Sequence, residues 1–364
     1  MNFATVAVDI AFSNPNDGVT AVFNNGYGNQ ALYTNDGGAK WVVDPSVEGL
    51  LFAGVAVTGT AAVIANQVGA EYATTDNSTN GYNFVASHLP GGIKSQNVDD
   101  FGDGKSFGVI GQDLLQGGEG VAVSVDRGAH FTFFNISIAK TWARYGAFPS
   151  ATNWFVTLGE WPGENNVENA PEGCEVIRTV SERLRIVRNK KTGEVFHDIR
   201  RQPTPEDCFN CYAGQIVATT NGGKTWTQQW YNASYYYFNQ VTCGSTTNCV
   251  AVAEAQSGHN PGVHIFTTKN GGKTWTETMF TAAPDYSIFA AEFVSATEVW
   301  ASGASLSLPL EGYFWHSTDG GSTWTFLQNA LKGAYPVAIS FSDPAHGWAV
   351  GPNQIGTSFL ASYS

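Results

Sequence analysis

Carboxylates are the residues of this chain with the clearest potential for catalysis, because two of them about 5 to 10 Å apart can hydrolyse a glycosidic bond. Five candidates belong to segments that are expected to meet at one face of the molecule: Glu160, Glu164, Asp99, Asp100 and Asp285. Spacing along the chain does not pair them. The segment DFGDGKS from Asp100 also resembles a set of calcium ligands, but its position recurs along the chain as a turn, and this favours a tight turn.

Aromatic residues are expected at the same face. The candidates for ligand binding are Trp142, Trp161, Tyr235, Tyr236, Tyr237, Tyr286 and Tyr335. Aromatic rings beside carboxylates suit stacking on sugars or contact with a peptide. Packing between neighbouring sheets is the alternative role for such residues.

A repeated motif determines how these residues are positioned. Ser or Thr is followed by Asp or Asn, then Gly, then Trp or Phe, in TNDGGAKW, SVDRGAHF, TTNGGKTW, TKNGGKTW and STDGGSTW, which start at residues 34, 124, 219, 268 and 317. A degraded copy runs from Thr74 to Phe84. Asp and Asn bond nearby backbone groups and Gly supplies positive φ, so each copy predicts a hairpin turn rather than a catalytic site. A repeat of 40 to 50 residues indicates a radially repeated architecture.

A second signal predicts the number of repeats. Seven segments read apolar, polar turn, apolar, and their turns follow Phe12, Val57, Phe101, Phe148, Cys243, Phe293 and Phe341. We therefore expect an all-β, seven-bladed β-propeller that forms one domain over residues 1–364. Because the last blade lacks a motif, the N-terminal MNFATVAV is expected to supply its outer strand and close the ring.

The motif is identified as the Asp box of the bacterial neuraminidase repeat, so the chain resembles Asp-box β-propellers. FSDPAHGWAVG, VTCGSTTNCVAVA and IFTTKNGGKTWTE resemble blades of the photosystem II assembly and stability factor-like group. That resemblance implies a non-catalytic platform that holds another protein, with motifs on the hairpins between outer strands. A sialidase is not expected, because the first 143 residues contain a single arginine, Arg127, where sialidases resemble one another in an arginine triad.

An insertion interrupts blade four at residues 160–213. The sequence RLRIVRNKKTGEVFHDIR alternates apolar and polar residues around a turn and predicts a β-hairpin. The net charge of the chain is −13, which argues against a nucleic-acid partner, yet this arm is basic. Arg183, Arg185 and Arg188 therefore either keep a solvated arm soluble or grip an acidic partner.

Cysteine positions suggest an oxidising compartment. Cys243 and Cys249 flank a turn at positions that could face each other across a hairpin, and a disulfide between them would imply such a compartment; the sequence leaves the pairing open. Cys174, Cys208 and Cys211 bracket the insertion, where one disulfide or, with His197, a zinc site is possible on residue type; we favour the disulfide and expect no metal or cofactor. No apolar run of 18 or more residues is present and Met1 leads into an expected strand, so neither a membrane span nor a signal peptide is expected in this chain.

These observations predict a monomeric, non-catalytic binding propeller, secreted or otherwise extracytosolic. It would hold a polysaccharide or protein ligand at the aromatic side of the channel mouth, with the basic arm beside it. The alternative is a glycoside hydrolase or polysaccharide lyase that uses carboxylates on the same face. In that case two of the five candidates should converge in one cleft.

Overall fold

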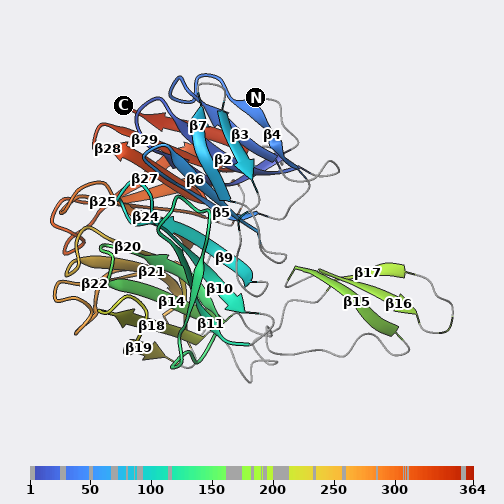
Figure 1. The fold of residues 1–364 in the computed structure, drawn as a ribbon. Coiled ribbons are helices and arrows are strands. Elements are labelled where there is room, and N and C mark those ends of the chain that lie inside the picture. The colour runs from blue at the N-terminus through green and yellow to red at the C-terminus, as the bar shows by residue number, and fades with distance from the viewer. Residues whose placement is uncertain are drawn as a thin grey trace.

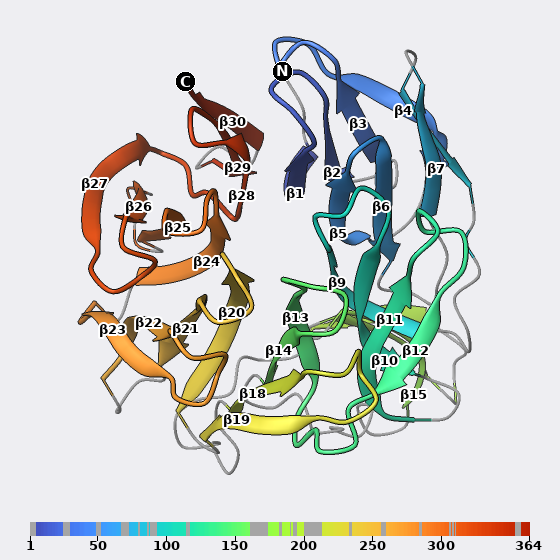
Figure 2. The ribbon, with the colours of Figure 1, turned by 60° about the vertical axis from the view of Figure 1, so that its left-hand side comes forward.

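The structure, a computed structural model, describes most of the chain. The residues that it does not describe are 1–4, 25–29, 49–51, 67–72, 79–80, 86, 88–92, 114–116, 161–173, 182–183, 190, 192–194, 200–212, 233–234, 256–259, 284–285, 306, 308, 310 and 354–357. The described chain is all β, and its sheets are arranged around a common axis (Figures 1 and 2).

Six sheets have four antiparallel strands each and form the blades of a β-propeller. The first three blades contain β1 (Thr5–Phe12), β2 (Gly18–Asn24), β3 (Gln30–Thr34) and β4 (Val42–Glu48); β5 (Phe52–Thr58), β6 (Ala61–Asn66), β7 (Ala73–Ser78) and β8 (Gly81–Val85); β9 (Ile93–Asp100), β10 (Phe107–Asp113), β11 (Glu119–Ser124) and β12 (Thr132–Asn135). The next three contain β13 (Ala143–Ala147), β14 (Trp154–Glu160), β18 (Ala213–Thr219) and β19 (Thr227–Asn232); β20 (Tyr236–Cys243), β21 (Cys249–Ala255), β22 (Gly262–Thr268) and β23 (Thr276–Thr281); β24 (Tyr286–Phe293), β25 (Val299–Ser305), β26 (Glu311–Ser317) and β27 (Thr325–Lys332).

The prediction of seven blades was wrong. The C-terminal segment forms a sheet of three described strands, β28 (Ala338–Asp343), β29 (His346–Pro352) and β30 (Ser358–Tyr363), beside the six four-stranded blades. The described part of the N-terminal segment does not complete this sheet, because β1 pairs with β2 as the innermost strand of the first blade. The sequence predicted seven blades because it contains seven apolar hairpins. The seventh hairpin does form, as β28 and β29, but it is not part of a four-stranded blade.

Side chains rather than a shared sheet join the two ends of the ring. The backbone N–H of Phe12 donates to Ser340 Oγ at 3.0 Å, and that of Ala7 donates to Ser358 Oγ at 2.7 Å. Phe12 packs on Trp348 in a buried apolar cluster that β1 shares with the C-terminal sheet. Figure 2 shows β1 beside β28 and β29 at this junction.

The core lies between successive sheets. Inner strands are buried on both faces, as in β22, where every residue is buried, whereas no residue of the outer strand β23 is fully buried. This burial explains why inner strands read as continuous apolar runs and outer strands do not. Neighbouring sheets thus share one apolar layer after another around the ring.

The repeated motifs form the turns between third and fourth strands. In the last copy, the Gly321 N–H donates to Ser317 Oγ at 2.8 Å, and the N–H groups of Ser322 and Thr323 donate to Asp319 Oδ1. The hydroxyl-to-glycine bond recurs in the other four clean copies, at Gly38, Gly128, Gly223 and Gly272. These Asp and Asn side chains satisfy the backbone of a tight turn.

The insertion lies between β14 and β18, the second and third strands of the fourth blade, which pair with each other from Glu160↔Ala213 onward. It forms a three-stranded sheet of β15 (Cys174–Ser181), β16 (Leu184–Asn189) and β17 (Val195–Ile199). The prediction of a simple hairpin missed β15, which pairs with β16 on the side opposite β17. Figure 1 shows this sheet to one side of the ring.

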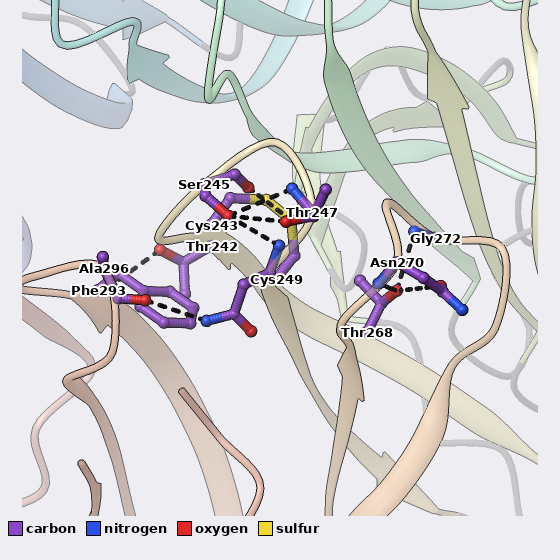
Figure 3. The surroundings of a disulfide bond; sticks show 11 residues. Thr242, Cys243, Ser245, Thr247, Cys249, Thr268, Asn270, Gly272, Phe293 and Ala296 are labelled. Carbon is purple, nitrogen blue, oxygen red and sulfur yellow. Dashed lines mark hydrogen bonds between the residues drawn. A yellow bond between two sulfur atoms is a disulfide. The ribbon is translucent and has the colours of Figure 1, made fainter. Parts of the chain in front are cut away.

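The disulfide between Cys243 and Cys249 is confirmed, with the two sulfurs 2.06 Å apart (Figure 3). The two residues are directly opposite each other where β20 turns into β21. Within the turn, Asn248 N–H donates to Ser245 Oγ at 3.1 Å, and the Asn248 side chain donates to Ala296 O in the next blade at 3.1 Å. The disulfide therefore cross-links the two ends of a turn that also contacts the neighbouring sheet.

Candidate functional site

A cavity of about 450 Å³ lies on the axis of the ring. It is lined by the innermost strand of every blade and of the C-terminal sheet, that is β1, β5, β9, β13, β20, β24 and β28. Figure 2 shows these strands surrounding the axis. Side chains that point inward from different blades can therefore act on one ligand.

Four carboxylates line this cavity from three strands: Asp9 on β1, Asp99 and Asp100 on β9, and Glu292 on β24. Among the described lining residues, Arg144 on β13 is the single Arg or Lys. The excess of negative charge in a buried space disfavours ionisation of each carboxyl.

The pKa values of these carboxyls reflect that environment. Burial raises the pKa of Asp9 to about 7, against two backbone hydrogen bonds that lower it. Burial, followed by the charge of Asp100, raises the pKa of Asp99 well above its usual range. The pKa of Glu292 is also raised well above normal, first by burial and then by the charges of Asp99, Asp100 and Asp9. Part of this cluster is therefore protonated near neutral pH.

Some of these carboxylates also join neighbouring sheets. Asp9 Oδ2 accepts a hydrogen bond from the backbone N–H of Val55 in the second blade at 2.8 Å. Glu292 Oε1 accepts one from the N–H of Phe341 in the C-terminal sheet at 3.2 Å. These two carboxylates are thus structural contacts between sheets as well as cavity-lining groups.

At the other end of the innermost strands, cations and aromatic rings gather. Lys94 Nζ lies over the Trp142 ring, 5.3 Å from its centroid, and Arg144 Cζ lies over the same ring at 5.1 Å. Arg144 Cζ is also 5.6 Å from the centroid of Tyr237. Lys94, Trp142, Arg144 and Tyr237 stand at or beside the first residues of β9, β13 and β20, and we call them the rim cluster.

The predicted aromatic residues differ in exposure. Tyr236 and Tyr237 are buried, and Tyr236 packs edge-on against Trp230 and Phe266 in the core between the fourth and fifth blades. Tyr235 is 39% exposed. Tyr286 stacks on Tyr313 with ring centroids 4.7 Å apart, and Tyr335 lies 5.9 Å from Phe289. The structure brings Trp142 and Tyr237 together around Arg144.

Several predicted site residues lie outside what the structure describes. Glu164, Asp285, Trp161 and Arg183 are not described, and for Glu160, Arg185 and Arg188 the description covers the backbone strand alone. The same holds for Cys174, while Cys208 and Cys211 are not described. Of the five carboxylate candidates, Asp99 and Asp100 are the two whose side chains can be placed, and both line the axial cavity.

Sequence reasoning missed Asp9, Glu292, Lys94 and Arg144. A signal for three of them was present, because a charged residue interrupts an apolar inner strand in TVAVDIAF, in YSIFAAEF and in ARYGA. A charge at such a position must face either a partner or the channel. Lys94, at the start of β9, carries no comparable signal.

No metal-binding group is formed by the described residues: no three His, Cys, Asp or Glu side chains are placed to share an ion. Among the same residues, no helix is long and apolar enough to cross a membrane.

Comparisons with known proteins show the fold. No protein-family model matches the chain, and no curated protein matches it. The chain is similar to the structure of YCF48 bound to D1 peptide, with 14% identity and a TM-score of 0.58 over 100% of this chain and 93% of that one. It is also similar to a GH74 xyloglucanase from Xanthomonas campestris, with 15% identity and a TM-score of 0.54 over 96% of this chain and 52% of that one. A PL25 ulvan lyase matches with 11% identity and a TM-score of 0.52 over 97% and 90%.

At these identities the likeness shows the architecture alone. The chain is a β-propeller. Structures of this shape include a peptide complex and glycan-active enzymes, so fold does not choose between binding and catalysis.

Proposed function

We propose that this chain is a non-catalytic binding propeller that holds a polymeric ligand, protein or glycan, at the aromatic side of its channel mouth. The observation that carries the proposal is the rim cluster, where Trp142 and Tyr237 flank Arg144 beside a cavity of about 450 Å³. Aromatic and arginine side chains around a concavity are typical anchors of a binding site.

The surroundings of the rim cluster support a preformed site. Arg144 is 4% exposed, and its Nε donates to the backbone oxygen of Gly159 at 3.0 Å. Because this buried hydrogen bond holds the guanidinium in place, a ligand finds it already oriented. The basic arm leaves the same blade directly after β14 and is proposed to add an electrostatic contact.

The disulfide supports an extracytosolic location as part of the proposal. Disulfides persist in oxidising compartments and are rare in the cytosol. The Cys243–Cys249 bridge therefore fits a protein that meets its ligand outside the cytosol.

The proposal is tested by probing glycan and peptide arrays with labelled protein and measuring the hits by calorimetry. Trp142→Ala should weaken binding of the hit at least fivefold, since loss of an aromatic contact costs about 1 kcal/mol or more. Tyr231→Ala is the matched control, because Tyr231 also carries a cation, Lys140, over its ring but lies on the outermost strand of the same blade. Equal losses in both variants, or no hit on either array, would contradict the proposal.

A polysaccharide hydrolase or lyase is the second candidate, favoured by the carboxyls of the axial cavity. With a pKa of about 7, Asp9 could donate a proton at neutral pH, as a general acid must. Asp99 lines the same cavity and is the natural partner to test. Release of new reducing or unsaturated ends from a polysaccharide panel that disappears in Asp99→Asn, with the folded state intact, would establish this candidate.

A further inference from the structure

The rim cluster carries two cations on one indole ring. Lys94 and Arg144 lie over Trp142 at similar distances, 5.3 and 5.1 Å from its centroid. They come from the innermost strands of adjacent blades, β9 and β13. Two positive charges therefore lie beside one ring, and an anion placed near both would be attracted to each of them.

Glu119 on β11 is an acidic residue that could balance these positive charges, because it interacts electrostatically with both Arg144 and Lys94. Glu119 Oε2 accepts a hydrogen bond from the backbone N–H of Ala143 at 2.7 Å, and the residue is 9% exposed. Burial raises the pKa of Glu119 to about 7 even though both cations lower it. Near neutral pH, Glu119 therefore compensates one of the two positive charges at most.

The Lys94 ammonium is able to donate hydrogen bonds to a ligand. Within the described part of the chain its ammonium makes no hydrogen bond or close ion pair; it lies over the Trp142 ring and interacts electrostatically with Glu119. Arg144 is held between Trp142 and Tyr237 and donates from Nε to Gly159 O and from a terminal nitrogen to Gln96 Oε1 at 3.4 Å. The rim thus presents a fixed guanidinium and a lysine that can reach a ligand.

We propose that Lys94, Trp142 and Arg144 form a subsite for a carboxylate of the ligand, contributed by an Asp or Glu side chain of a protein partner. The inference rests on the binding function proposed above and names the chemistry that the site recognises. A carboxylate would accept hydrogen bonds from the ammonium and bring a negative charge to the side of the ring system that carries the two cations. The Trp142 ring would exclude water from one side and strengthen that attraction.

Two features favour an acidic peptide over a glycan. Both cations lie over the Trp142 ring, so part of the surface on which a sugar would stack is already in contact with positive charge. The cavity beyond the rim is lined by Asp9, Asp99, Asp100 and Glu292, and those of them that are ionised disfavour an anion in the interior relative to the rim. A polyanionic glycan threaded along the axis would meet that repulsion at each acidic sugar, whereas a peptide can present one carboxylate at the rim.

The test uses the whole protein and two fluorescent peptides of 12 residues, one with Glu at alternate positions and one with Gln instead. Fluorescence anisotropy at about 50 mM salt should show the Glu peptide binding at least tenfold more tightly. Lys94→Gln should weaken the Glu peptide at least fivefold and leave the Gln peptide unchanged. Lys140→Gln, which removes the cation over Tyr231 on the outer edge of the blade, should change both affinities less than twofold.

The outcomes separate this inference from the function on which it rests. If both peptides bind equally and depend on Trp142 but not on Lys94, the binding function stands and the carboxylate subsite is rejected. If polygalacturonate binds in a Lys94-dependent manner and the Glu peptide does not, the assignment to a protein partner is overturned. Equal effects of Lys94→Gln and Lys140→Gln, or no binding of either peptide, also overturn the proposal.

Discussion

Phe12 and Trp348 stack face to face with ring centroids 3.5 Å apart and planes inclined by 3°. Phe12 ends the innermost strand of the first blade, and Trp348 lies in the middle strand of the C-terminal sheet. Trp348 Nε1 also donates to Gly37 O at 2.9 Å, in the first repeated turn. The ring is thus closed by a shared apolar cluster, with this aromatic pair in it, and by a few hydrogen bonds, and the described strands of the two ends do not share a sheet.

This junction should be a weak point of the ring. Trp348→Ala removes a buried side chain, 4% exposed, and should lower the free energy of unfolding by about 3–5 kcal/mol. Chemical denaturation followed by circular dichroism measures the change. Phe326→Ala, at a residue that is 38% exposed on an outer strand and packs on Trp315, should cost clearly less than Trp348→Ala. Comparable losses at the two positions would show that packing at the junction stabilises the fold no more than packing on an outer strand does.

The axial carboxyls should make the protein less stable as pH rises. The folded-state pKa of Asp9 is about 7, above its ordinary value of 3.8, so its contribution is complete below about pH 4 and is lost as pH increases through 7. Asp9→Asn cannot ionise and keeps an oxygen to accept from Val55. Between pH 5 and 8 the wild type should therefore lose on the order of 2 kcal/mol more than the variant. Denaturation curves with parallel pH dependence would refute the assignment.

The disulfide should add modest stability. It closes a short loop between Cys243 and Cys249, with a sequence separation of 6, and a loop of this length is worth about 2 kcal/mol. Reduction should lower the free energy of unfolding of the wild type by that amount without unfolding it. In a Cys243→Ser/Cys249→Ser variant, reductant should no longer change the free energy of unfolding. A response of the same size in the variant would assign the effect to the other cysteines.

The repeated turns should tolerate exchange of Asp for Asn. Asp319 accepts from the N–H groups of Ser322 and Thr323 through Oδ1, and Asn221 and Asn270 occupy the same place in two other copies. Asp319→Asn should be nearly neutral at pH 7, whereas Asp319→Ala should cost about 1–2 kcal/mol. Thermal denaturation distinguishes them. If Asn is as damaging as Ala, the charge rather than the turn hydrogen bonds is what matters.

Much of the fold follows from residues with local signatures. The turns at Asp36, Asp126 and Asp319 need only four or five neighbouring residues, and the Cys243–Cys249 bridge needs only a hairpin register. The completeness of the last sheet was not predictable in this way. The apolar pattern of β1 is compatible with pairing to β2 or to another strand. The hydrogen bond from the Phe12 N–H to Ser340 Oγ joins residues far apart in the chain, and no pattern in the neighbouring sequence indicates it.

The site was predictable in outline only. Trp142 and Tyr237 were recognised because they precede or begin inner strands, but sequence spacing gave no indication that Arg144 lies between their rings. The cluster of Asp9, Asp99 and Glu292 depends on strands from three blades that meet only in the folded ring. Contacts of this kind arise from the closure of the propeller and not from any one repeat.

The central claim is that ligand binds at the channel mouth beside Trp142, and hydroxyl-radical footprinting tests it most directly. The protein is oxidised with and without a saturating amount of the hit from the arrays, and oxidation is quantified at Trp142 and at Tyr231 by mass spectrometry. Trp142 is half-buried and Tyr231 is 37% exposed, so both can react in the free protein. Oxidation of Trp142 should fall at least threefold in the complex while that of Tyr231 is unchanged. Protection of Tyr231 with none at Trp142 would place the ligand on the outer edge of the blade and contradict the account.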